Sequence, residues 1–359
     1  MIIKSVHLKS YRNYDNQTIT FKPGLNVLVG ENAVGKTNLI ESIYVSSMYS
    51  SPKKVNDKDL VSFNKDNAQI KIDLQKKYRS HIISIKIPTS GKKSVSIDGI
   101  PLTKSSDLLG VLSVVFFSPQ EMKLIQESPI DRRKFLDISL SQQEKPYLKA
   151  LSNYNKILTQ KNALLKEEIA VDNLNDMLNI WDQQLAKEGE IIISRRMEFL
   201  KKLSKYASKQ NTIISGGKDS LQLSYDANIS LEGSIQDNLY NALLENREKD
   251  ISLRFTTVGP HRDDINIILN GKDAKKFGSQ GQQRSITLAM KLASLYIYKD
   301  EMGEFPVLLL DDVLSELDPN RQHVFLESLK DIQCILSCTK YTVDVDANII
   351  NIENGKVKN

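Results

Sequence analysis

The stretch LNVLVGENAVGKTNLIESIY, residues 25–44, decides the fold. Its first five residues are apolar except for Asn26 and rich in β-branched side chains, which is typical of a buried parallel strand. The eight residues that follow, GENAVGKT, fit the pattern G-x-x-x-x-G-K-[ST] of a phosphate-binding loop. Leu39, Ile40 and Ile43 then recur at helical spacing, so we expect the loop to open a helix. A strand before the loop and a helix after it distinguish this match from a chance glycine-rich turn.

The loop supplies the groups that a nucleoside triphosphate requires. Its two glycines permit backbone angles that turn successive N–H groups inward, and these groups form an anion site with the helix N-terminus. Lys36 places a positive charge between the β- and γ-phosphates, and the Thr37 hydroxyl can ligate Mg²⁺. We therefore predict ATP and Mg²⁺ as cofactors, and the predicted nucleotide-binding residues of the loop are Gly30, Glu31, Asn32, Ala33, Val34, Gly35, Lys36, Thr37 and Asn38.

The composition is that of an ordinary globular protein. The 359 residues are 40% apolar and 26% charged, with a mean hydropathy of −0.34. No apolar run approaches the ~20 residues that span a membrane, so we expect a cytoplasmic protein without a membrane partner. Two cysteines give no disulfide framework, and four scattered histidines give no metal-ligand spacing. The net charge of +5 permits a nucleic-acid partner but does not require one.

A second apolar strand, FPVLLLDD at residues 305–312, ends in two acids. Asp311 lies where the Mg²⁺-coordinating carboxylate of a Walker B motif belongs, and Asp312 can orient or deprotonate the attacking water. The alternative is a pair of acids that caps the following helix. We predict Asp311 and Thr37 as metal ligands, and Asp312 and Lys36 as catalytic residues.

Two further polar residues are candidates for the same site. Gln120 comes just after an apolar strand at residues 111–117, where a side chain can reach Mg²⁺ or the γ-phosphate, and we predict it as catalytic. Pro119 would end that strand in any case, so the loop also has a purely structural explanation. Arg12 lies in the turn of a predicted hairpin and is predicted to contact the nucleotide; a solvated surface charge is the alternative.

A second loop has the pattern of an anion site. Residues 277–284, FGSQGQQR, precede a strongly helical segment, so Ser279 and Gly281 lie where a loop gives way to a helix N-terminus. One nucleotide rarely needs two such loops unless two protomers share it. The alternative is an ordinary helix cap, because Ser279 begins an S-x-x-Q stretch. We predict Ser279, Gly281 and Gln282 as nucleotide-binding residues.

Three alternating segments, at residues 69–74, 81–87 and 93–99, indicate an antiparallel meander. The turns between them are basic, KKYR at 76–79 and SGKK at 90–93. Solvated turns explain these charges, and a rim that faces DNA is the alternative.

The pattern then changes to long helices. Apolar residues recur every three or four positions from residue 147 to 199, and glycine is nearly absent until Gly216. Two long amphipathic helices, packed as an antiparallel pair, explain this pattern. The predicted fold is therefore α/β, a P-loop ATPase head with a mixed sheet and an inserted, mainly helical arm domain. The predicted borders give a head of residues 1–128 and 251–359 and an arm of residues 129–250.

Several motifs together resemble the RecF family of bacterial recombination mediators, within the SMC/ABC class of ATPases. They are LKSYRNY (8–14), FFSPQE (116–121), SPIDRRKFLD (128–137), GPHRDD (259–264) and LLLDDVLSELDPNRQ (308–322). The resemblance spans nearly the whole chain and implies an ABC/SMC-like head. It also implies an ATP-dependent homodimer with two nucleotides between the heads, in which Ser279, Gly281 and Gln282 would act on the nucleotide of the other subunit.

The same resemblance implies a function. RecF-like proteins bind double-stranded DNA and junctions of single- and double-stranded DNA, work with RecR, and, with RecO and RecA downstream, help to load RecA at gapped DNA in recombinational repair and replication restart. We expect slow, DNA-stimulated ATP hydrolysis, because ABC heads usually carry Glu where this chain has Asp312, and because ILSCTK (335–340) lacks the usual histidine. The alternative is a nucleotide-binding subunit of another ABC-type ATPase, transporter-like or SMC-like, that does not act on gapped DNA.

Overall fold

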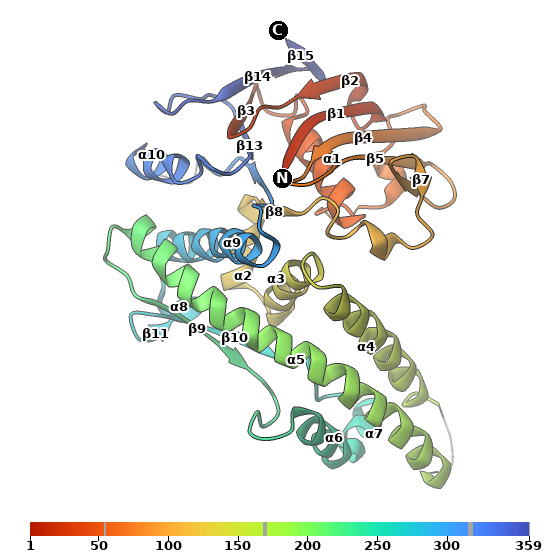
Figure 1. Ribbon diagram of the computed structural model, residues 1–359. Helices are drawn as coiled ribbons and strands as arrows, with labels where there is room; N and C mark the ends of the chain where they lie inside the picture. The colour runs from red at the N-terminus through yellow and green to blue at the C-terminus, as the bar shows by residue number, and fades with distance from the viewer. Residues whose placement is uncertain (54, 168–170, 315–318, 359) are drawn as a thin grey trace. The chain divides into compact units, whose positions relative to one another are not determined.

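The computed structural model describes residues 1–53, 55–167, 171–314 and 319–358 (Figure 1). By their contacts the residues form two compact units, Met1–Glu121 with Lys291–Asn359, and Met122–Met290. The sequence pattern places the borders at 128/129 and 250/251 instead. The later border differs because residues 264–269 pair with residues 221–226 and so belong with the inserted unit.

The first unit contains an antiparallel sheet whose strands are β1 (Ile2–Tyr11), β2 (Tyr14–Thr20), β4 (Asn67–Gln75), β5 (Ser80–Pro88), β6 (Ser94–Ile97) and β7 (Ile100–Pro101). They lie in the order β2-β1-β4-β5-β6-β7. In β4, Ala68, Ile70, Ile72 and Leu74 are buried, whereas the residues between them are not. This period of two produces a sheet with one buried face, and the predicted meander is confirmed.

The first unit also contains a mixed sheet, whose strands are β3 (Leu25–Val29), β8 (Val114–Phe117), β12 (Val307–Asp311), β13 (Cys334–Cys338), β14 (Asn348–Glu353) and β15 (Lys356–Lys358). They lie in the order β15-β14-β3-β13-β12-β8, and all neighbours are parallel except β14 and β15. Helix α1 (Lys36–Met48) contacts strands of both sheets. The apolar faces of both sheets and of α1 form one core.

Shorter elements connect these layers. They are η1 (Asp57–Leu60), η2 (Ser105–Leu108), η3 (Pro119–Met122) and α10 (Pro319–Glu327). Helix α9 (Gln280–Met302) begins in the second unit and ends in the first.

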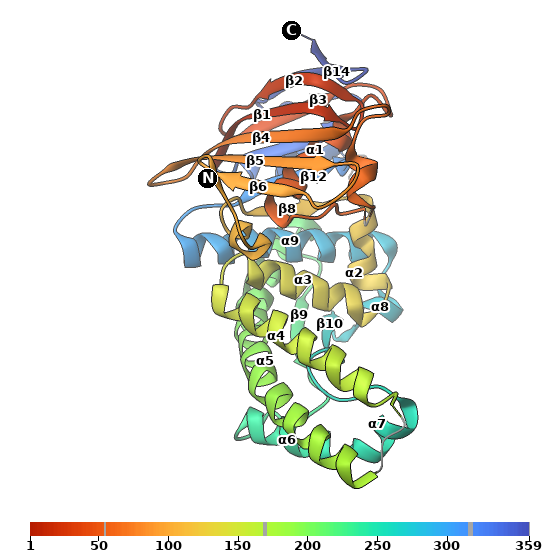
Figure 2. The ribbon, with the colours of Figure 1, turned by 90° about the vertical axis from the view of Figure 1, so that its right-hand side faces the viewer.

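The second unit is built on helices α2 (Lys123–Gln126), α3 (Pro129–Ser141), α4 (Lys145–Leu164), α5 (Val171–Ser215), α6 (Ile235–Glu245), α7 (Arg247–Leu253) and α8 (Ala274–Phe277). Helices α4 and α5 lie side by side, as both views show, so the predicted helix pair is confirmed (Figures 1 and 2). The unit also holds a small sheet in the order β11-β10-β9, with strands β9 (Leu221–Asp226), β10 (Asp264–Leu269) and β11 (Lys272–Asp273).

A buried ion cluster joins α4, α5 and α7. Lys161 is fully buried, and its Nζ lies 2.7 Å from Asp182 Oδ1 and 3.1 Å from Asp250 Oδ2. Arg247 Nη2 lies 2.8 Å from the other oxygen of Asp182. Breaking such a cluster is costly because it leaves buried charge without a partner.

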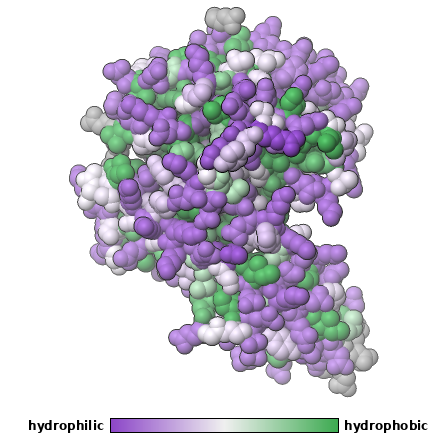
Figure 3. Space-filling model, in the orientation of Figure 1, coloured by the Kyte–Doolittle hydropathy of each residue, from purple (hydrophilic) through white to green (hydrophobic). Residues whose placement is uncertain are grey.

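No helix in the described part of the chain is long and apolar enough to cross a membrane. On the face seen in Figure 3, hydrophilic residues predominate and hydrophobic residues gather in small groups.

Candidate nucleotide-binding site

The phosphate loop between β3 and α1 is built by close backbone approaches. Gly35 is the N-cap residue of α1 with φ at 120°, in the region that favours glycine. A Cβ at Gly35 would also lie 2.6 Å from Asn13 Nδ2, and a Cβ at Gly30 would lie 2.3 Å from the Ile352 carbonyl oxygen. The fold of the loop therefore requires both glycines of the motif.

The Lys36 ammonium group contacts the backbone of the phosphate loop. Its Nζ donates to the carbonyl oxygens of Gly30 and Glu31, each at 2.6 Å. Burial lowers the pKa of this amine, whereas nearby negative groups, Asp311 and Asp312 among them, oppose the shift. The ammonium and the loop N–H groups together attract phosphate oxygens.

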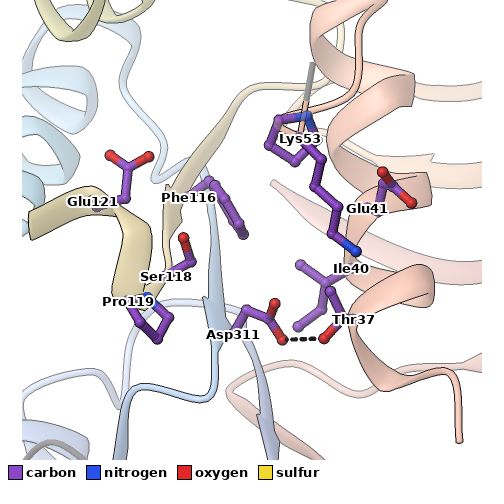
Figure 4. A pocket seen from close by; sticks show the side chains of 10 residues that line it. Thr37, Ile40, Glu41, Lys53, Phe116, Ser118, Pro119, Glu121 and Asp311 are labelled. Carbon is purple, nitrogen blue, oxygen red and sulfur yellow. Dashed lines mark hydrogen bonds between the residues drawn. The ribbon is translucent and has the colours of Figure 1, made fainter. Parts of the chain in front are cut away.

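Thr37 meets the end of β12. Its hydroxyl donates to Asp311 Oδ1 at 2.9 Å (Figure 4), and the Ser337 hydroxyl donates to the same oxygen at 2.7 Å. These residues are far apart in sequence and meet because β3, β13 and β12 are neighbours in the mixed sheet. A hydroxyl beside a carboxylate offers the oxygen ligands that Mg²⁺ prefers.

Asp312 follows at the end of β12 and is exposed. Its backbone lies at φ 55°, in the left-handed region that residues with a Cβ rarely adopt. Its N–H donates to Ser337 Oγ at 3.0 Å. Ser337 therefore positions both acids at once, through the side chain of Asp311 and the backbone of Asp312.

A cavity of about 170 Å³ opens beside these groups. Thr37 and Asp311 line it together with Ser118 and Glu121, which come from the segment after β8 (Figure 4). Glu121 is held by Lys291 Nζ at 2.5 Å. The segment predicted to approach the γ-phosphate thus lies at the site.

Two predicted features fall partly or wholly outside the described residues. The backbone of Gln120 belongs to η3, but its side chain is outside the description, so its catalytic role stays a prediction. Residues 315–318, the SELD segment, are outside it entirely.

The turn between β1 and β2 braces the phosphate loop. Asn13 Nδ2 donates to the Val34 carbonyl oxygen at 2.8 Å, and Tyr14 OH donates to the Gly35 carbonyl oxygen at 3.0 Å. Asn38 donates to Asn13 Oδ1 at 2.9 Å. In this structure Asn38 shapes the loop through Asn13.

Arg12 pairs with a glutamate in this structure. Its Nε and Nη2 donate to the two oxygens of Glu41, each at 3.0 Å, and its Nη1 donates to the Asp59 carbonyl oxygen at 2.8 Å. Glu41 is buried on α1 and also accepts from Ser51 Oγ at 2.6 Å. Bidentate pairs of this kind are strong, so Arg12 ties the turn to α1. Its contact with a nucleotide stays a prediction.

The second predicted anion loop lies in the second unit and forms a complete helix cap. Ser279 N donates to Gln282 Oε1 at 3.0 Å and Gln282 N donates to Ser279 Oγ at 3.3 Å, which is a capping box. Gln282 Nε2 also donates to Asp219 Oδ1 at 3.1 Å. A Cβ at Gly281 would meet nothing within 4 Å among the described residues. Packing within the chain does not explain this glycine, which costs a helix about 1 kcal/mol relative to alanine.

The motifs RRKFLD and GPHRDD meet in the second unit. Arg132 Nε and Nη2 donate to the two oxygens of Asp264 at 2.6 and 2.9 Å. Arg196 from α5 donates to Asp137 Oδ1 at 2.8 Å and to the Pro260 carbonyl oxygen at 2.6 Å. These bonds tie α3 and α5 to the segment that leads into β10, so the motifs shape this unit.

The basic turns of the antiparallel sheet have partners within the chain. The Lys93 side chain is only 8% exposed, pairs with Asp57 at 2.7 Å and lies over the ring of Tyr49 at 4.2 Å. Arg79 pairs with Asp98 at 3.2 Å. These contacts favour a structural explanation for the turns over a DNA-facing rim.

Reasoning from sequence missed Ser337 and Glu41. Ser337 stands at the carboxyl end of an apolar strand, as Asp311 does, and that position was the available signal. Glu41 looks like any surface residue of a helix, and only the structure shows that it is buried.

The fold and this site define a class of protein. The family model described as RecF/RecN/SMC N terminal domain matches residues 2–355. An Smc head domain from Pyrococcus furiosus, bound to the C-terminal domain of ScpA, has a TM-score of 0.59 at 19% identity and covers 99% of this chain and 95% of its own. That likeness shows the fold alone. The predicted class, an ABC/SMC-like ATPase head with a mixed sheet and an inserted arm, is confirmed.

More similar relatives narrow the class to one family. The DNA replication and repair protein RecF of Clostridium perfringens (strain SM101) is 44% identical over 364 residues, which cover both chains completely. That of Clostridium kluyveri is 44% identical over 362 residues, 99% of each chain. The structure of the recombination mediator protein RecF-ATP in the RecFOR pathway has a TM-score of 0.91 at 34% identity, and covers 99% of this chain and 96% of its own. The chain belongs to the RecF family, as its motifs predicted.

Proposed function

We propose that this protein is an ATP-driven switch that acts on DNA in replication and recombinational repair. The observation that carries the proposal is the bond between the phosphate loop and the acid at the end of β12, Thr37 Oγ1 to Asp311 Oδ1 at 2.9 Å. The relatives that are 44% identical over the whole chain are DNA replication and repair proteins, which supports the assignment to DNA.

The loop N–H groups and Lys36 would hold the β- and γ-phosphates. Thr37 and Asp311 fit a Mg²⁺ ion, because their oxygens are already neighbours and are of the hard type that this ion selects. When bound, Mg²⁺ would offset negative charge on the phosphates. The RecF-ATP structure supports ATP as the nucleotide.

Asp312 is the proposed base or orienting group for the water that attacks the γ-phosphate, with Lys36 and Gln120 assisting. It is exposed at the strand end, and Ser337 holds its backbone. Its side chain is one methylene shorter than the Glu usual in ABC heads. We propose turnover below one per second, against ~10 per second for a typical enzyme, with stimulation by duplex DNA.

Ser279, Gly281 and Gln282 would complete the site from a second copy of the chain. The open space at Gly281 supports this, because a group from outside the chain can approach the N-terminus of α9 there. ATP would thus join two copies into a symmetric dimer, and hydrolysis would release it.

The dimer would bind double-stranded DNA and junctions of single- and double-stranded DNA. It would work with RecR and RecO and promote RecA loading at gapped DNA. The relative solved as RecF-ATP in the RecFOR pathway supports RecR and RecO as partners.

Light scattering with saturating ATP tests the proposal. The wild-type mass should double with ATP, Lys36→Met should stay monomeric because it loses the phosphate-binding charge, and the exposed control Lys104→Met should behave as wild type. Asp312→Asn should form a dimer that persists. A wild-type protein that stays monomeric at saturating ATP, or binds duplex DNA equally with and without it, would refute the proposal.

A further inference from the structure

The antiparallel sheet has a face that the core does not use. One face buries a regular set of apolar side chains, among them Val6, Leu8, Ile70, Ile72, Ile83 and Ile85. The alternate residues of β1, β4 and β5 point the other way. Figure 2 looks onto β2, β1, β4, β5 and β6 side by side, in front of α1. We call the solvent side of these five strands the outer face.

Three lysines share the outer face. Lys9 on β1 stands opposite Gln69 on β4, and Gln69 stands opposite Lys86 on β5. Lys71 follows two residues after Gln69 and so points to the same side. Because residues opposite one another in neighbouring strands share a face, the three lysines form one group. The backbone positions of Lys9 and Lys86, two strands apart, are separated by about 10 Å.

The surrounding side chains are mostly small and polar, and Ile82 of β5 is an exposed apolar residue among them. They include His7, which bonds to Thr18 at 2.9 Å across β1 and β2, and the cross-strand neighbours Asn16, Ser84, Ser94 and Ser96. Strands β1, β5 and β6 contain no acid, and the acid that β4 adds to this face is the half-buried Asp73. The acid of β2, Asp15, precedes Asn16, so alternation turns it from this face, and it pairs with Lys65 at 3.7 Å. The outer face is therefore positive and rich in hydrogen-bond donors.

The three lysines are exposed, and none of them has an ion-pair or hydrogen-bond partner among the described residues. This sets them apart from Lys93, which is buried against Asp57, and from Lys161, which is buried between two carboxylates. Exposed cations without counter-charges attract a polyanion, because they release its condensed counterions on contact.

We infer that the outer face binds the phosphate backbone of double-stranded DNA through Lys9, Lys71 and Lys86. The inference rests on the proposed DNA binding and names the surface that carries it. Hydroxyl and amide side chains between the lysines add donors for phosphate oxygens. Such contacts position the protein on the duplex without reading its sequence.

The test is a triple variant, Lys9→Gln/Lys71→Gln/Lys86→Gln, titrated with a labelled duplex in saturating ATP over a series of salt concentrations. Three lost phosphate contacts should reduce the magnitude of the slope of log K against log salt by about 2.7. The ratio of the affinity at 0.1 M salt to that at 1 M salt should therefore be about 500-fold smaller in the variant than in the wild type. A matched triple on exposed lysines elsewhere in the same unit, Lys104→Gln/Lys330→Gln/Lys356→Gln, should keep the wild-type slope.

Two controls separate a surface effect from a folding defect. The Gln triple should retain the ATP-dependent mass in light scattering, and the corresponding Arg triple should restore the salt slope. If the Gln triple binds duplex DNA with the wild-type salt slope, the inference is overturned and the proposed function stays intact. If the Gln triple keeps that slope but no longer binds an acidic protein partner, the outer face is the binding surface for that partner. Absence of ATP-dependent DNA binding in the wild type would defeat the proposed function itself.

Discussion

Replacing Ser337 by alanine should slow ATP hydrolysis far more than it weakens ATP binding. The Ser337 hydroxyl donates to Asp311 Oδ1 and accepts the N–H of Asp312, so it fixes the relation between the two acids. Without Ser337, Asp311 still accepts the hydrogen bond from the Thr37 hydroxyl, so the phosphate loop and Asp311 stay joined. The nucleotide should therefore still bind, whereas Asp312 should lose its defined position.

The magnitude follows from these two bonds. A hydrogen bond to a charged group is worth about 1.5–3 kcal/mol, so the free energy of unfolding should fall by about 2–3 kcal/mol. For a unit of this size that lowers the Tm by about 4–12 °C. A left-handed backbone costs a non-glycine residue about 1–2 kcal/mol, and Asp312 pays this at φ 55°. If Ser337 no longer offsets that cost, Asp312 leaves the conformation and turnover falls about tenfold.

Single-turnover hydrolysis, nucleotide titration and thermal unfolding measure the three quantities separately. The matched control is Ser47→Ala, because Ser47 is also buried and its hydroxyl donates to the Leu112 carbonyl oxygen at 2.7 Å, away from both acids. The control should lose stability but keep its turnover. If Ser337→Ala loses stability and hydrolyses ATP at the wild-type rate, Ser337 is only a structural residue and the reasoning is refuted.

Three further predictions concern the second unit. Asp219→Ala should weaken ATP-dependent dimerisation about three- to tenfold, because Gln282 loses its carboxylate partner. Gln282→Ala should weaken dimerisation equally, and the double variant should weaken it no further. Additive losses for the two substitutions, measured by sedimentation velocity, would contradict this coupling. Lys161→Met should lower the free energy of unfolding by about 3–5 kcal/mol, because it removes the cation that two buried carboxylates share. The exposed control Lys156→Met should change it by less than about 0.5 kcal/mol, and equal denaturation midpoints for the two variants would count against the prediction. Burial lowers the pKa of His261 to about 4, below its ordinary value of 6.5. Between pH 6.5 and 4, therefore, this histidine binds a proton in the unfolded chain but not in the folded chain. Relative to His261→Gln, the wild type should keep its full stability above pH 6.5 and lose about 3 kcal/mol as the pH falls to 4, and parallel denaturation curves would disprove it.

Apolar periodicity and glycine positions predicted the individual strands, helices and the phosphate loop. The strand, loop and helix at residues 25–44 follow from apolar periodicity and two glycines, and the acids at the end of β12 follow from a buried run. The pair of α4 and α5 follows from helical spacing. In each case the signal can be read in windows of about 11–18 consecutive residues.

Features that depend on tertiary partners could not be read this way. The sequence around Arg12 does not indicate its ion pair with Glu41. The sequence around Asp311 likewise does not indicate its hydrogen bond with Ser337. The predicted later border, 250/251, differs from that of the compact unit, which ends at Met290, because β10 pairs with β9 across residues whose sequence indicates helix and loop. For Ser279 the structure is compatible with a helix cap and with a nucleotide-binding role. The loop forms the expected cap, and Gly281 beside it is open to a group from a second copy.

The strand order of the mixed sheet has a consequence for folding during translation. Strand β14 pairs with β3, the Ile352 carbonyl oxygen packs against Gly30, and the Gly355 N–H donates to the Val34 carbonyl oxygen at 2.9 Å. A ribosome therefore synthesises the phosphate loop early and the strand that closes over it more than 300 residues later. Such distant pairings form slowly, since a long loop must close before they bring any gain. The nucleotide pocket of a nascent chain consequently stays incomplete until residues 348–355 have been synthesised.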